Sequence, residues 1–184
     1  MADTKISGMT AATTLAGADI FPIVQSAANK SSTLGLVRDY VLGTTSQVTG
    51  SDFTTTSTSL VNITGLTFAA SANALYEVDA LLRIQNSGTN AIQFAIAYSA
   101  AGATGTFFFA GNQTATTSVS QMSALGVANG SFYATVATTN FVALIHGIVV
   151  TGANAGNITA QTIHATSGTT TVYIGSRMSV RQLA

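Results

Sequence analysis

Residues 140–150, NFVALIHGIVV, alternate as a β-strand does, but neither face of this strand is polar. One face would carry Phe141, Ala143, Ile145 and Val149. The other would carry Val142, Leu144, His146, Ile148 and Val150. Side chains of a strand point alternately to its two sides, so a strand that is apolar on both sides must be covered twice. In a two-layer protein the second cover comes from outside, from an arm or from another subunit, and we expect another subunit to supply it.

Residues 58–184 contain strand-like segments at short intervals, separated by Gly, Asn, Ser and Thr. The segment 74–85, ALYEVDALLRIQ, shows the pattern most clearly. Its inward row is Tyr76, Val78, Ala80, Leu82 and Ile84, and its outward row includes Glu77, Asp79 and Arg83. We count eight to ten strands with no helix-length pattern between them, which excludes a parallel βαβ architecture. The sequence therefore predicts an all-β, antiparallel, jelly-roll-like β-sandwich.

The first 42 residues differ from this body and predict a short N-terminal arm. They hold half of the charged residues and the only proline, Pro22. Because the residue before a proline is pushed to extended conformations, DIFPIVQS predicts a short extended segment or edge strand. Ser32 or Thr33 can then cap one short helix. The apolar stripe of that helix is Leu34, Val37 and Val41. A helix of about ten residues is marginal alone, so we expect the arm to dock on a partner or on the body.

Residues 43–57, GTTSQVTGSDFTTTS, have no apolar periodicity and consist mostly of Gly, Ser and Thr. A flexible segment of this length has a root-mean-square span of about 20 Å. We therefore predict three parts, which are an attachment arm at 1–42, a tether at 43–57 and the sandwich at 58–184.

The composition limits the classes of partner. Only 7% of residues are charged, and six basic residues balance six acidic ones without any Lys/Arg cluster. This distribution gives no electrostatic footprint for nucleic acid. The longest apolar run has about eleven residues, fewer than the roughly 20 that a membrane helix needs. The first twenty residues also lack the pattern of a secretory signal. A net charge near zero gives little repulsion between copies, which is typical of a subunit in an assembly.

Few residues offer site chemistry. His146 and His164 are the only histidines, there is no cysteine, and no acidic residue lies at ligand-like spacing from either histidine. We expect interior or interface histidines that bond a hydroxyl or carbonyl, or alternatively a pH-sensitive contact. For Glu77 and Asp79 we expect surface ion pairs, with Arg83 and Arg177, rather than catalysis. The sequence predicts a non-enzymatic protein with no catalytic residue, metal or cofactor.

Residues 5–41, from KISGMTAATT to VRDYV, resemble the N-terminal module found on virion proteins of tailed bacteriophages. The matching residues are Lys5, Ile6, Ser7, Ala11, Ala12, Gly17, Asp19, Phe21, Pro22, Ile23, Val24, Gln25, Arg38, Asp39 and Tyr40. In such proteins the module is usually taken to attach a projecting part to the particle. The rest of the chain, with GLTF and YEVDALLRI, is similar in pattern to jelly-roll domains on phage particles, which are often trimeric.

The resemblance implies a structural virion protein, a capsid decoration or cement protein that stabilises the shell by clamping neighbouring capsid subunits. Fibres with this module commonly continue for hundreds of residues, whereas this sequence ends after one sandwich. We therefore expect a location on the capsid exterior after synthesis in the host cytoplasm. The implied partners are further copies of the chain, expected as a trimer, and the major capsid protein, with no nucleic acid and no membrane. The alternative is a short tail or head fibre that binds a host receptor or glycan.

Two residue sets are expected to carry these contacts. Anchoring to the capsid is assigned to Ile6, Phe21, Ile23, Val24, Leu34, Val37 and Val41. Self-association is assigned to Val142, Leu144, His146, Ile148 and Val150.

Overall fold

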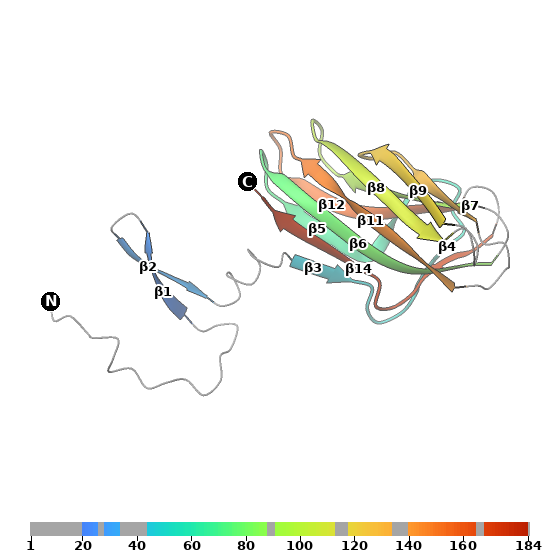
Figure 1. Ribbon diagram of the computed structural model, residues 1–184, viewed down its shortest axis with the longest axis horizontal. Helices are drawn as coiled ribbons and strands as arrows, with labels where there is room; N and C mark the ends of the chain where they lie inside the picture. Colours follow the sequence, from blue (N-terminus) through green and yellow to red (C-terminus); the bar gives the residue numbers. More distant parts are fainter. Residues whose placement is uncertain are drawn as a thin grey trace. The chain divides into compact units, whose positions relative to one another are not determined.

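A computed structural model describes residues 20–25, 28–33, 44–87, 91–112, 118–133, 140–164 and 168–183 (Figure 1). The chain divides into two compact units, Met1–Leu42 and Gly43–Ala184. The residues described form strands and turns and contain no helix. Within these ranges, no helix has the length and hydropathy that crossing a membrane requires. The division agrees with the predicted end of the N-terminal arm.

The N-terminal unit contains a two-stranded antiparallel hairpin. Strand β1 (Ile20–Gln25) pairs with β2 (Ala28–Thr33), and Pro22 lies opposite Ser31. The extended segment predicted around Pro22 is confirmed, while β2 was not predicted. Ser32 and Thr33 end β2, and the helix predicted after them lies outside the described residues.

The second unit is a sandwich of two antiparallel sheets, as the sequence predicted (Figure 1). The smaller sheet has the order β10-β7-β12-β5, and the larger has β3-β14-β6-β11-β8-β9, with β13 paired to β6 and β4 paired to β13. The strands of the smaller sheet are β5 (Val61–Ala70), β7 (Ala91–Tyr98), β10 (Asn129–Tyr133) and β12 (Gly156–His164). Those of the larger sheet are β3 (Thr44–Gln47), β4 (Phe53–Thr55), β6 (Leu75–Asn86), β8 (Thr104–Asn112), β9 (Ser118–Ala124), β11 (Asn140–Val150), β13 (Thr170–Val172) and β14 (Arg177–Gln182).

Strands β5 to β12 form four nested antiparallel pairs. β5 pairs with β12, β6 with β11, β7 with β10 and β8 with β9. Successive pairs alternate between the two sheets. The chain therefore runs like one long antiparallel hairpin wound across the sandwich, which is the jelly-roll-like arrangement.

The predicted tether at 43–57 is wrong for most of its length. Within it, β3 pairs with β14 and β4 pairs with β13, so both belong to the larger sheet. Val48 is buried and Phe53 packs against the core. These strands are rich in Thr and Ser rather than in apolar residues, and their stability comes from pairing with strands at the other end of the sequence. Their apolar periodicity was therefore too weak to reveal them.

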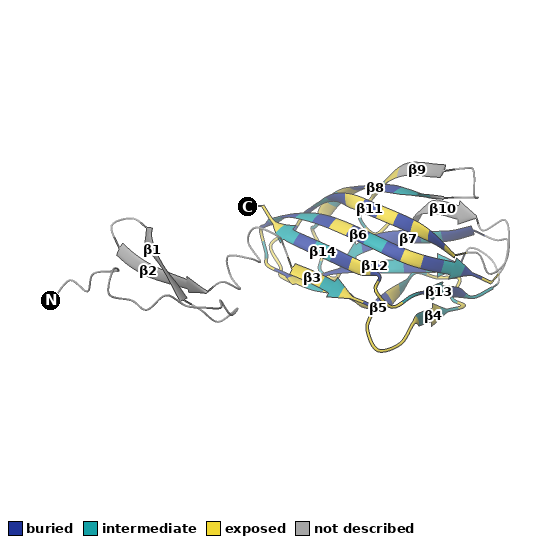
Figure 2. Ribbon diagram, turned by 60° about the horizontal axis from the view of Figure 1, so that its bottom comes forward, coloured by how far each residue is buried: buried dark blue, intermediate teal, exposed yellow. Residues whose placement is uncertain are grey.

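The core lies between the two sheets and is built from alternate residues of each strand. In β6 the predicted inward row is buried, while Asp79 and Arg83 are exposed and Glu77 is half-buried. Figure 2 shows the resulting alternation of buried and exposed positions along β6 and β11. The largest fully buried side chains are Tyr76, Phe94, Phe107, Phe109, Ile63, Leu66, Leu82, Ile84, Ile92, Ile96 and Ile145. This row pattern confirms that period-two alternation fixes which face of each strand meets the core.

Candidate functional site

Strand β11 has one face in the core and an apolar face on the outside of the larger sheet (Figure 2). Phe141, Ala143, Ile145 and Val149 belong to the core. On the opposite face Leu144 is 50% exposed, and Val142 and Val150 are exposed to a similar degree. The doubly apolar character predicted for this strand is therefore confirmed, and among the described residues of the sandwich these three side chains stay exposed.

The strand register brings outward residues from six strands into one row. In order across the sheet these residues are Thr45, Ser179, Asp79, His146, Phe108 and Met122. An adjacent row contains Arg177, Leu81, Leu144 and Ala110. Directly opposite residues in antiparallel strands point to the same face, so both rows belong to one surface.

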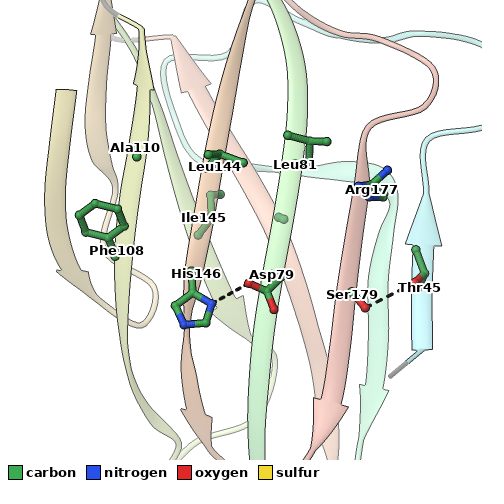
Figure 3. A pocket seen from close by; sticks show the side chains of 11 residues that line it. Thr45, Asp79, Leu81, Phe108, Ala110, Leu144, Ile145, His146, Arg177 and Ser179 are labelled. Carbon is green, nitrogen blue, oxygen red and sulfur yellow. Dashed lines mark hydrogen bonds and ion pairs between the residues drawn. The ribbon is translucent and has the colours of Figure 1, made fainter. Parts of the chain in front are cut away.

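Exposed apolar side chains gather on three neighbouring strands of this surface. The outer apolar patch consists of Phe108, Met122, Val142, Leu144 and Val150. Met122 is its most exposed member, at 68%. Phe108 and Leu144 line an open hollow of about 550 Å³, at which Asp79, His146 and Arg177 also lie (Figure 3). Monomeric soluble proteins rarely leave a contiguous apolar surface of this kind uncovered.

Charged side chains lie beside the patch rather than within it. The charged flank consists of Glu77, Asp79, Arg83, Arg177 and Arg181 on β6 and β14. These are five of the six charged residues of Gly43–Ala184. The sixth, Asp52, accepts a hydrogen bond from the backbone N–H of Ile174.

Ion pairing on the flank was predicted, but with the wrong partners. Arg181 donates to the Glu77 carboxylate at 2.5 Å, while Arg83 lies 4.6 Å from the centre of the Tyr173 ring as a cation–π contact. The His146 Nδ1–H donates to Asp79 Oδ1 at 2.6 Å, across the β6–β11 register. Both side chains of that pair are 57% exposed.

Two acidic residues lie near His146 in space, although neither lies at ligand-like spacing from it in the sequence. Ligand atoms of Glu77, Asp79 and His146 all fall within 4.8 Å of one another. The register, not the sequence spacing, brings them together, since β6 and β11 are far apart in the chain. Each carboxylate already has a protein partner, and the Arg181 guanidinium beside Glu77 opposes a second cation. The arrangement is therefore a cluster of paired side chains on the outer face of the larger sheet.

His164 occupies a different setting, fully buried at the end of β12. Its Nε2–H donates to Asn86 Oδ1 at 2.8 Å, in line with the predicted bond to a carbonyl. Its Nδ1 is buried and has no hydrogen-bond partner among the described residues. Burial lowers the pKa of His164 below its ordinary value of 6.5, because a charged imidazolium would be desolvated there.

Acid should destabilise the fold through His164. The unfolded chain binds a proton near pH 6.5 and the folded one only at lower pH, so stability is full above pH 6.5 and falls as the pH is lowered. We expect the melting temperature to drop between pH 7 and pH 5. His164→Gln should reduce this pH dependence, whereas the exposed control His146→Gln should retain it. Equal pH profiles for His164→Gln and the wild type would contradict this role for His164.

The predicted anchoring residues fall into two groups, those outside the described residues and those in β1. Ile6, Leu34, Val37 and Val41 lie outside the described residues. Phe21, Ile23 and Val24 lie in β1, of which only the backbone is described. Their role in attachment stays a prediction.

Sequence reasoning missed two members of the surface around β11, Phe108 and Met122. Phe108 lies between Phe107 and Phe109, and only these two outer residues of the run are buried. The period of two in this short strand is the signal that separates Phe108 from its neighbours. Met122 had no such signal, because only the register of β9 places it on this face.

Comparisons with known proteins do not identify a family for this chain. No model of a known family and no curated protein matches the chain. Among solved structures, a chain titled "Structure of infectious bursal disease virus Gx strain" aligns with 89% of this chain at 13% identity and a TM-score of 0.19. The alignment covers 44% of that chain, so the present chain spans less than half its length. A similarity at this score supports no statement about fold or function.

Proposed function

We propose that the chain is a structural virion protein of a tailed bacteriophage, which decorates the capsid exterior and stabilises it by clamping neighbouring capsid subunits. The observation that carries the proposal is the outer apolar patch, a surface that suits a subunit held in an assembly. The resemblance of residues 5–41 to a phage attachment module supports the same reading. The separate compactness of Met1–Leu42 is what an attachment unit requires.

Clamping follows from linking several weak contacts through one oligomeric body. Once one N-terminal unit binds a capsid subunit, the others are held at a high effective concentration near their own sites. Binding to several subunits at once then opposes their separation. The proposed role is mechanical and includes no catalysed reaction.

The proposed function can be tested on capsids that lack the protein. Adding back the full chain should raise the temperature at which such capsids rupture and release DNA, measured by the fluorescence of a DNA-binding dye. Bovine serum albumin at equal mass is the control for non-specific protein. An unchanged rupture temperature despite saturating chain would contradict the stabilising role.

The hollow beside Phe108 supports one alternative, a short tail or head fibre that binds a receptor or glycan. Its volume of about 550 Å³ lies within the range of small-ligand sites. A glycan array probed with the full chain distinguishes the two functions. Specific retention of a sugar, lost in Phe108→Ala, would favour the fibre.

A further inference from the structure

We propose that the outer face of the larger sheet is the surface through which the chain binds a second copy of itself, with the outer apolar patch of one copy stacked on that of the other. This inference deepens the assembly part of the proposed function and rests on it for its biological setting. Its physical basis is independent, because it depends only on the size, composition and shape of this face.

The size of the face matches a stable interface. Strands β14, β6, β11, β8 and β9 lie side by side, and neighbouring strands are about 4.8 Å apart, so they span about 19 Å. At about 3.3 Å per residue, the length of β11 is about 36 Å. The product is about 700 Å², close to the roughly 800 Å² that each partner contributes to a typical stable complex.

The face has an apolar part and a charged part, as the centre and the rim of a protein interface do. The outward side chains of β11 and β8 carry no acidic or basic residue apart from His146. The charged flank lies to one side, on β6 and β14. Interfaces commonly have an apolar centre depleted of charge and a polar rim, and the two parts of this face correspond to that arrangement.

The shape of the face suits a copy of itself. Two sheets pack face to face when their twists match, and two copies of one sheet have the same twist. The face also offers a projection and a recess. Met122 is its most exposed apolar side chain, and the hollow at Phe108, Ala110 and Leu144 lies on the neighbouring strands. In a symmetric contact each copy can place its projection against the recess of the other.

The charges of the flank do not oppose such a contact. Two carboxylates and three guanidinium groups share the flank, and Glu77 and Asp79 each have a partner within their own subunit. A second copy therefore meets both signs of charge rather than a surface of one sign. A strongly acidic or basic partner has no matching field on this face, which favours a copy of the chain over such a protein.

The test compares two aspartate variants by sedimentation velocity at micromolar concentration. Leu144 and Ile174 are 50% and 49% exposed, but Ile174 lies in the turn between β13 and β14, whereas the patch lies on β8, β9 and β11. We expect the wild type and Ile174→Asp to sediment as a multiple of 18.6 kDa, and Leu144→Asp to sediment as a folded 18.6-kDa monomer. A wild type that is monomeric, or a Leu144→Asp variant that keeps the wild-type mass, would overturn the inference.

A second measurement applies if Leu144→Asp does not fold. The chain has no cysteine, so Leu144→Cys and Ile174→Cys each introduce a single thiol. With a short bismaleimide reagent, Leu144→Cys should form covalent dimers in high yield and Ile174→Cys should not. No dimer from Leu144→Cys, or equal yields from both variants, would overturn the inference.

A failure of the self-association interface can be distinguished from a failure of the proposed capsid role. A wild type that is oligomeric through this face but does not bind capsids leaves the interface intact and removes the capsid role. A monomer that binds capsids leaves the capsid role intact and removes the interface.

Discussion

A chain lacking residues 1–42 should form a folded body that no longer binds capsids. Gly43–Ala184 is a compact unit by itself, with its own core and its own two sheets. Removing the proposed attachment unit takes away every anchoring contact at once, along with the gain from holding several anchors on one oligomer. That gain is about 100-fold or more in affinity. Co-sedimentation with capsids over a range of chain concentrations measures the loss.

The control for this deletion is a full-length chain in which residues 1–42 are present in scrambled order. It keeps the length and composition of the N-terminal unit but removes its sequence, so it should bind as weakly as the deletion. Circular dichroism should show that all three proteins keep the β-sheet signal of the sandwich. Undiminished capsid affinity of Gly43–Ala184 would contradict the anchoring role of the N-terminal unit.

Gly147→Ala should destabilise the sandwich by about 3 kcal/mol or more, because the centre of β11 has no room for a methyl group. A Cβ at this position would lie 2.3 Å from the Thr106 carbonyl oxygen and 2.4 Å from Phe107 Cδ1. Replacing glycine by alanine also restricts the unfolded chain, which stabilises a protein by about 0.4–1 kcal/mol. The collision involves the backbone of β8, which cannot move without breaking its pairing with β11, so the destabilising effect is the larger one.

Gly126→Ala is the matched comparison for this substitution. Gly126 has a φ of +73°, and an added Cβ there would meet nothing within 4 Å. Its cost is that of a left-handed backbone alone, about 1–2 kcal/mol. Urea unfolding at one protein concentration should rank the wild type above Gly126→Ala, and Gly126→Ala above Gly147→Ala. A Gly147→Ala variant as stable as Gly126→Ala would contradict this account of β8–β11 packing.

The sandwich could be predicted because alternation alone fixes the inward rows. Tyr76 to Ile84 on β6 and Phe141 to Val149 on β11 are continuous patterns, and each places its apolar row in the core. Strands β3 and β4 could not be predicted in this way. They contain mainly Thr and Ser, and they become strands through pairing with β14 and β13, more than a hundred residues away in the chain.

The residues of the candidate site could be predicted only where the pattern of a single strand shows which way they point. The outward residues Val142, Leu144 and Val150 follow from the pattern of β11 itself. The pair of Asp79 and His146 does not, since these residues are 67 positions apart and only the register of β6 and β11 places them side by side. The same holds for Met122, which enters the surface through the pairing of β8 with β9.

The location of the protein on the particle distinguishes a capsid decoration protein from a tail protein. Gold-labelled antibodies against the chain, viewed on intact virions by electron microscopy, report that location. We expect gold distributed over the capsid surface. Gold confined to the tail would contradict this expectation.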